Sequence, residues 1–263
     1  TAIGSKIKIM IPRRAYAKVN IFLKITGIRG EYHTLSSRFM RVSSLYDTLR
    51  FERKTTPEFE IRGNFDCEVH SNTIYKAYKY LLAASHSEKL SAFFEDHAVC
   101  VEKNIPSFAG LGGGSSDAAT FLTMCNEDLD LGLSVDELAR IGADVGADVP
   151  FFVYGYESAN IRGIGEIVER YDEPLLHFEV TTPALEISTP AVYRYYREHR
   201  FDPISEEEAA RLEATPSREI LASMSAKEAN DLYPAALGCY PQLKEQEGWF
   251  FSGSGSSFFR IKE

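Results

Sequence analysis

The first clear pattern along the chain is an alternation of apolar and polar side chains over residues 14–26. Apolar side chains fill every second position, at Ala15, Ala17, Val19, Ile21, Leu23 and Ile25. A period of two is typical of a strand with one face in the core, and we expect this strand to end at Gly27. The same period places Lys18 and Asn20 together on the more polar face.

Shorter patterns predict a mixture of strands and helices after this first strand. Asn72 is a suitable N-cap for a helix that has an apolar side. That side carries Ile74, Tyr78, Leu81 and Leu82. Further strand-like runs cover residues 39–42, 48–52, 59–61, 98–103 and 175–181. The alternation of such elements predicts an α+β fold.

A glycine-rich loop over residues 106–117 (PSFAGLGGGSSD) leads into an apolar helical pattern. That pattern consists of Ala118, Leu122, Cys125 and Leu129. We expect Ser115, Ser116 and Asp117 to cap the helix. Unpaired N–H groups and the helix dipole attract anions at such a start, so the loop predicts a phosphate site. A flexible linker or a tight strand-to-helix turn is the alternative.

This loop differs from the two best-known phosphate-binding motifs. A Walker P-loop needs a lysine after its glycines, and none follows here. A dinucleotide fingerprint needs a third glycine at a different spacing. A nucleotide in this loop would therefore be held by another architecture.

Asp148 lies in an otherwise apolar region between two predicted elements. Ser134 and Glu137 form a capping box for the preceding helix, which we expect Gly146 to end. Pro150 favours an extended residue before it, and residues 151–154 are expected to form a buried strand. Asp148 would then lie on a short turn.

The remaining residues predict a second structural unit. Residues 158–170 and 249–259 are typical of hairpins. Thr189 and Pro190 are expected to be the cap and first residue of a helix, and acidic helices are expected around residues 205–214 and 226–237. We therefore predict two domains, residues 6–160 and residues 161–263.

Composition and charge narrow the functional classes. The chain has 263 residues and a net charge of −9, which disfavours nucleic acid as a partner because duplex binding relies on many Lys and Arg contacts. No run approaches the roughly 20 apolar residues of a membrane span, and the first ten residues lack a signal-peptide core. The four cysteines form no C-x-x-C pair. We expect a cytoplasmic protein, a monomer or weak homodimer, with no dedicated metal ligands.

Five motifs in the same order resemble those of the GHMP kinases, named for galactokinase, homoserine kinase, mevalonate kinase and phosphomevalonate kinase. They are residues 17–20 (AKVN), 30–35 (GEYHTL), 110–116 (GLGGGSS), 146–150 (GADVP) and 251–256 (FSGSGS). The resemblance implies a two-domain architecture, with a nucleotide domain like domain 2 of ribosomal protein S5 and a ferredoxin-like second domain. It also implies transfer of the ATP γ-phosphate, with Mg²⁺, to 4-diphosphocytidyl-2-C-methyl-D-erythritol.

The resemblance also assigns roles to individual residues. Lys18 and Asp148 would be the catalytic pair, with Lys103 and Asn72 near the adenine. The ATP phosphates would be held by Pro106, Ser107, Phe108, Ala109, Gly110, Leu111, Gly112, Gly113, Gly114, Ser115 and Ser116. Substrate would be held by Asn20, Tyr32, His33, Thr189, Tyr193, Gly253 and Gly255. Arg162 departs from the family pattern, because an acidic residue is common there.

Each assignment has a purely structural alternative. Asp148 could bond only to backbone amides of its turn, and Lys18 could be a solvated strand lysine. Tyr193 could belong to the core, and residues 252–257 could form only a turn. The function has alternatives too: another small-alcohol kinase of the superfamily, such as mevalonate or homoserine kinase, or an S5-like RNA-binding module. The pair Tyr32 and His33 favours a substrate that carries a base, because a ring can stack on it while polar groups contact its edge.

Overall fold

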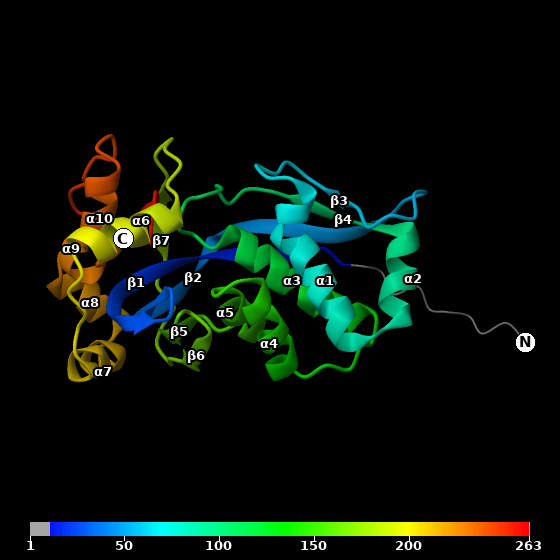
Figure 1. Cartoon of the computed structure of the whole chain (residues 1–263), viewed down its shortest axis with the longest axis horizontal. Helices are drawn as coiled ribbons and strands as arrows, with labels where there is room; N and C mark the ends of the chain where they lie inside the picture. Colours follow the sequence, from blue (N-terminus) through cyan, green and yellow to red (C-terminus); the bar gives the residue numbers. More distant parts are fainter. Residues whose placement is uncertain (1–10, 263) are drawn as a thin grey trace, which may run out of the picture.

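The structure is a computed structural model that describes residues 11–262. The first residues of the predicted nucleotide domain, 6–10, lie outside the described residues, as does residue 263 of the predicted second domain. Most of the chain is arranged around two long antiparallel strands, β1 (Arg13–Arg29) and β2 (Tyr32–Arg53), which run through the length of the molecule in Figure 1.

A six-stranded sheet forms around β2, whose two ends pair with different strands. Residues 48–53 of β2 pair with β4, and residues 35–40 pair with β5. The strands besides β1 and β2 are β3 (Ile61–Arg62), β4 (His97–Glu102), β5 (Ser158–Gly163) and β6 (Ile167–Arg170). Because β5 and β6 extend this sheet past residue 160, we propose that the first domain includes them.

Five helices between residues 73 and 154 pack together against one end of this sheet. They are α1 (Thr73–Ser85), α2 (Glu88–Asp96), α3 (Gly113–Asp128), α4 (Val135–Val145) and α5 (Val149–Tyr154), with a 3₁₀ turn at Val69–Ser71. Their apolar faces form one core with the sheet, in which Phe94, Phe121 and Leu122 are buried. This core fixes α3, and therefore the glycine loop that precedes it, against β1.

The elements after residue 177 gather at the other end of β1 and β2 (Figure 1). A small antiparallel sheet has the order β7 (Phe178–Thr181), β9 (Phe258–Ile261) and β8 (Phe250–Phe251). The helices are α6 (Thr189–His199), α7 (Glu206–Ala214), α8 (Ser217–Ser223), α9 (Ala226–Ala229) and α10 (Leu232–Cys239). Over residues 11–262, no helix combines the length and apolar character needed to cross a bilayer.

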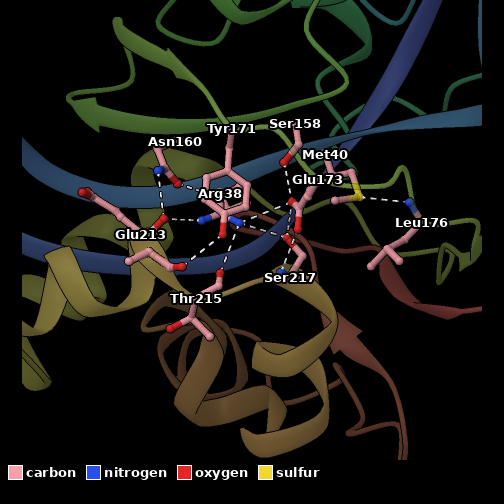
Figure 2. Close-up of polar contacts among 11 residues, drawn as sticks. Arg38, Met40, Ser158, Asn160, Tyr171, Glu173, Leu176, Glu213, Thr215 and Ser217 are labelled. Carbon is pink, nitrogen blue, oxygen red and sulfur yellow. Dashed lines mark hydrogen bonds and ion pairs between the residues drawn. The ribbon is translucent and has the colours of Figure 1, made fainter.

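Arg38 on β2 joins the two halves (Figure 2). Its side chain is fully buried, and its guanidinium lies 3.4 Å from the ring centre of Tyr171. It donates to Asn160 Oδ1 at 2.6 Å and to the Glu213 carbonyl at 2.6 Å, and forms an ion pair with Glu173 at 3.3 Å. The large sheet is thereby connected to the α7–α8 segment.

The structure confirms several sequence expectations. The first strand is present as β1, Asn72 caps α1 through its side chain, and the capping box of Ser134 and Glu137 opens α4. The hairpin over residues 158–170 and the strand–turn–strand near residues 249–259 are also present.

Other expectations are wrong, for local physical reasons. Residues 151–154 form helix α5 rather than a strand, because Pro150 occupies its first turn, where no N–H is needed. Helix α3 begins inside the glycine run, with Gly112 as its N-cap, so Ser115 and Ser116 lie in its first turn. The runs at 39–42 and 48–52 belong to one continuous strand, β2.

The C-terminal helix boundaries also differ from the prediction. Ser188 is the N-cap of α6, so Thr189 is its first residue. The helix expected over residues 226–237 is divided into α9 and α10 at Asn230. Its side-chain amide donates to the Phe251 and Gly253 carbonyls, both at 2.9 Å, and the backbone leaves the helical conformation to reach them.

Candidate active site

A cleft of about 1020 Å³ lies between the glycine loop, β1 and α6. Its lining brings together nearly all the site residues that the sequence predicted, although they are spread from Lys18 to Gly253 along the chain. Two predicted residues do not line it. Ser116 is buried on the other side of α3, and Gly255, within the turn of residues 252–257, lies against the Phe251 ring.

Lys18 and Asp148 face each other in this cleft. Lys18 Nζ lies 3.5 Å from Asp148 Oδ2. The Lys18 ammonium also donates to Asn20 Oδ1 at 2.7 Å and to the Gly110 carbonyl at 3.1 Å. Asn20 in turn donates to Ser37 Oγ at 3.0 Å. The shared face of β1 therefore carries a fixed cation that points at the carboxylate of the 146–148 turn.

The Lys18 and Asp148 side chains differ in how deeply they are buried, and burial changes the pKa of Lys18. The Lys18 side chain is only 4% exposed, whereas that of Asp148 is 32% exposed. Desolvation lowers the pKa of Lys18 below that of an ordinary lysine, and the charge of Asp148 opposes part of this effect. The ring of Phe39, whose centre lies 4.4 Å from Nζ, adds to the apolar wall around this cation. Asp148 remains open to a molecule in the cleft.

The glycine loop forms the cleft wall beside this pair. Gly110 and Gly112 both adopt left-handed φ values of +72°, which L side chains rarely adopt. The N-cap position of α3 has no side-chain hydrogen bond. By helix geometry the first N–H groups of α3, at Gly113, Gly114 and Ser115, have no acceptor within the helix. All three residues line the cleft, so it contains a set of donors suited to an anion.

The C-terminal turn, residues 252–257, holds the glycine loop in place. Ser252 Oγ donates to the Gly110 carbonyl at 2.9 Å, and Ser257 N donates to the Ala109 carbonyl at 3.1 Å. A Cβ at Gly110 would lie 2.1 Å from the Ser252 carbonyl oxygen. The two backbones therefore approach as closely as a glycine allows.

Aromatic residues line the opposite end of the cleft. Tyr32 is 65% exposed, whereas His33 is buried and its Nε2 has no hydrogen-bond partner among the described residues. The His33 ring lies 5.2 Å from that of Tyr193 on α6. Burial, together with the positive charge of Arg197, lowers the pKa of His33. A neutral imidazole whose buried Nε2 has no partner among the described residues therefore lies at the wall of the cleft. Thr189 hydrogen-bonds Ser254 at 2.6 Å beside it.

Lys103 and Asn72 line the cleft on the far side of the glycine loop. Asn72 uses its side-chain oxygen as the cap of α1, accepting from Ile74 N at 2.9 Å. Lys103 contacts two buried carboxylates, Asp47 and Asp117, which the sequence reasoning did not assign to the site. The sequence did contain a signal for Asp117: an acidic residue lies on the apolar side of the helix that follows the glycines.

Comparisons with known proteins agree with this arrangement. The family model of the GHMP kinases N terminal domain matches residues 72–156. A 4-diphosphocytidyl-2-C-methyl-D-erythritol kinase of Sulfurimonas denitrificans is 59% identical over 259 residues, which are 95% of this chain and 96% of that protein.

Solved structures share the fold. A crystal structure of a 4-(cytidine 5'-diphospho)-2C-methyl-D-erythritol kinase aligns with a TM-score of 0.72 at 32% identity, over 96% of this chain and 90% of that one. The mevalonate kinase of Methanococcus jannaschii aligns with a TM-score of 0.62 at 12% identity, over 98% of this chain and 92% of that one. The predicted α+β fold of GHMP kinase type is confirmed.

Proposed function

We infer the reaction of this cleft from one premise: the chain belongs to the family of 4-diphosphocytidyl-2-C-methyl-D-erythritol kinases, within the GHMP kinases. It is an ATP-dependent phosphotransferase that phosphorylates the 2-hydroxyl of 4-diphosphocytidyl-2-C-methyl-D-erythritol, in the non-mevalonate synthesis of isoprenoid precursors. Mevalonate and homoserine kinases, the predicted alternatives, are more distant relatives at 12% and 16% identity in their solved structures. Membership of this kinase family also disfavours the other predicted alternative, an S5-like RNA-binding module.

We propose that Asp148 is the general base and that Lys18 assists it. The observation that carries this proposal is the 3.5 Å contact between Lys18 Nζ and an Asp148 carboxylate open to the cleft. Asp148 would accept the proton of the attacking hydroxyl as its oxygen bonds to the γ-phosphorus of ATP, while the bond from that phosphorus to the bridging oxygen breaks and ADP leaves. Lys18 would hold the Asp148 carboxylate in place through the ion pair and stabilise the charge on the transferring phosphoryl group. Because this transition state is loose, positioning contributes as much as proton removal.

The glycine loop is proposed to hold the ATP phosphates with the free N–H groups at the start of α3. Mg²⁺, which neutralises phosphate charge in such reactions, prefers oxygen ligands. Ser115 Oγ fits this requirement, because it lines the cleft and lies 3.9 Å from the Cβ position of Gly146, close to the turn that carries Asp148. We propose that Ser115 and Asp148 face the ion, while Ser116 is too deeply buried to do so.

The aromatic end of the cleft is proposed to hold the cytosine. Tyr32 offers an exposed ring for stacking. His33 Nε2 has no hydrogen-bond partner among the described residues, and can donate to or accept from the base edge, depending on its tautomer. A substrate without a base would leave this buried nitrogen unpaired.

Replacing Asp148 by Asn tests the proposed base. We expect kcat to fall by about 10²–10⁴-fold, because the amide has almost the same shape but cannot take the proton. The affinity for ATP should change little. ADP release with the cytidyl substrate measures turnover, and titration of the protein with ATP measures binding.

Asp144→Asn is the matched control, since Asp144 is an exposed carboxylate near the end of α4, four positions before Asp148. It should keep the parental kcat. Equal turnover in the Asp148→Asn variant and the parent would show that Asp148 has only a structural role.

A further inference from the structure

The basic side chains that line the cleft differ in whether they already have a partner. Among residues 11–262 they are, histidine aside, Lys18, Lys103, Arg194 and Arg197. Both lysines are held by carboxylates at 3.5 Å or closer, and Arg197 Nη2 donates to the Glu31 carbonyl at 2.8 Å. The Arg194 side chain is exposed and has no hydrogen bond or ion pair with the described residues. Arg194 is therefore the cation of this set that remains open to a ligand.

Helix α6 carries Arg194 on the face that borders the cleft. The cleft-lining residues of this helix are Thr189, Pro190, Tyr193, Arg194 and Arg197. Steps of three and four residues separate them along two rows, as expected for one face of a helix. Arg194 therefore belongs to the wall of the cleft, although the rest of α6 packs on the C-terminal core through Val192 and Tyr196.

The start of α6 lies near the groups proposed to carry out the transfer. Thr189 hydrogen-bonds Ser254 at 2.6 Å. A Cβ at the neighbouring Gly253 would lie 3.4 Å from Asn20 Oδ1, which is the oxygen that accepts from the Lys18 ammonium at 2.7 Å. The first turn of α6 is thereby connected to the reacting end of the cleft.

Later residues of α6 lie at the aromatic end, where the cytosine is expected. The Tyr193 ring lies 5.2 Å from the His33 ring, and Arg197 is bonded to the residue before Tyr32. Arg194 lies between these two parts of the helix. A substrate that extends from the base to the reacting hydroxyl therefore passes α6 at the level of Arg194.

The proposed substrate carries a diphosphate between its cytidine and its reacting alcohol, with negative charge on both phosphates. The protein has a net charge of −9, and its cleft is also lined by Glu31, Asp66, Asp117 and Asp148. Such an anion needs a local cation, because the overall field of the protein repels it. An arginine suits this role, since its planar fork donates two parallel hydrogen bonds to phosphate oxygens.

We propose that Arg194 binds the diphosphate of the cytidyl substrate and thereby fixes how the substrate lies between the aromatic end and the reacting end of the cleft. Arg194 donates to the phosphate oxygens and takes no part in the transfer itself. The inference rests on the proposed function, because it needs the cytidyl substrate in this cleft. The diphosphate does not react, so the contact is the same before and during the transfer and acts on KM rather than on kcat.

Arg194→Met tests this contact, because Met keeps an apolar stem but has no guanidinium. KM for the cytidyl substrate should rise about tenfold, since hydrogen bonds to charged groups contribute this much or more, while kcat should stay within about twofold of the parental value. Arg194→Lys should recover only part of the affinity, because an ammonium lacks the planar fork.

Two inhibitors locate the lost contact within the substrate. Cytidine 5'-diphosphate and cytidine are compared as inhibitors against the cytidyl substrate, with ATP saturating so that the glycine loop is occupied. In Arg194→Met the Ki of cytidine 5'-diphosphate should rise about tenfold. The Ki of cytidine, which has no phosphate, should stay at the parental value.

Arg200→Met is the matched control. Arg200 is an exposed arginine that ends the same helix, and it does not line the cleft, so its variant should keep the parental KM and Ki values. Parental values of KM and of the Ki of cytidine 5'-diphosphate in Arg194→Met would overturn the inference and leave the proposed function intact. An equal rise in the Ki of cytidine would also overturn it, because the lost contact would then lie at the base. A parent protein that does not phosphorylate the cytidyl substrate would instead contradict the proposed function.

Discussion

At the scale of single residues, the cleft contains polar and charged side chains whose burial costs free energy. Lys18 is a buried cation, and one ring nitrogen of His33 and one carboxylate oxygen of Asp117 have no hydrogen-bond partner among the described residues. Buried polar groups normally have partners, and within residues 11–262 the His33 nitrogen and the Asp117 oxygen have none, which favours a ligand that completes their contacts. The cation is the most demanding of them, and its hydrogen bonds to Asn20 and Gly110 keep it in place.

Tyr32 provides the residue-scale test of specificity. Tyr32→Ala should weaken binding of the cytidyl substrate by about 1–3 kcal/mol, the usual contribution of stacking one base, while KM for ATP stays close to the parental value. Tyr32→Phe keeps the ring and should bind nearly as well as the parent. Binding of the substrate to each variant can be measured by calorimetry. Unchanged affinity in Tyr32→Ala would mean that the base lies elsewhere.

At the scale of elements, sequence patterns predicted best where one period or one cap determines the structure. The alternation over residues 14–26 correctly placed Lys18 beside Asn20, and the capping box correctly opened α4. Residues 149–154 could not be assigned in this way, because a short apolar run is compatible with either a buried strand or a helix. The first residue of α3 could not be predicted either. Its N-cap, Gly112, has no side chain, so the sequence contains no capping residue that would indicate where the helix begins.

Asp117 shows what local patterns leave out of the site. Its partners, Asp47 and Lys103, are 70 and 14 positions away in the chain, counted as 117 − 47 and 117 − 103. Only the pairing of β2 with β4 brings those partners to the helix. Long-range pairing of this kind has no local sequence pattern.

The close approach at Gly110 gives the element-scale prediction. Gly110→Ala should abolish most turnover and destabilise the protein, because its Cβ would overlap the Ser252 carbonyl. Gly132→Ala is the matched control: its φ of +74° is nearly the same, but no atom of residues 11–262 lies within 4 Å of the new Cβ. That variant should lose about 1–2 kcal/mol from backbone strain alone and keep its kcat. Urea unfolding and ADP release measure both effects, and equal behaviour of the two variants would refute a tight contact.

At the scale of the whole molecule, Arg38 connects the large sheet to the C-terminal helices. Its guanidinium contacts β5, the segment after β6, and residues 213–217 (Figure 2). The same strand, β2, carries His33 and Phe39, which contribute to the cleft. The buried contacts of Arg38 therefore help to fix the position of β2, and with it the cleft residues His33 and Phe39, relative to the C-terminal helices.

Arg38→Met gives the prediction for this scale. Glu173 would remain buried without its cation, so the free energy of unfolding should fall by about 3–5 kcal/mol. Arg260→Met is the comparison, because Arg260 is half-exposed and pairs with Glu179 on the surface. Loss of that pair should cost about 1 kcal/mol or less. Urea unfolding of both variants measures the difference, and a similar loss in each would contradict a structural role for the buried arginine.

The support of the glycine loop by residues 252–257 has a consequence for synthesis of the chain. Ser252 follows Gly110 by 142 positions, so a ribosome makes Lys18, the loop and Asp148 long before the turn that braces them. Throughout that interval the Gly110 carbonyl lacks its hydroxyl partner, and the small sheet beneath it lacks two of its three strands. We therefore expect an interrupted translation product to contain both proposed catalytic side chains, Lys18 and Asp148, yet be unable to consume ATP.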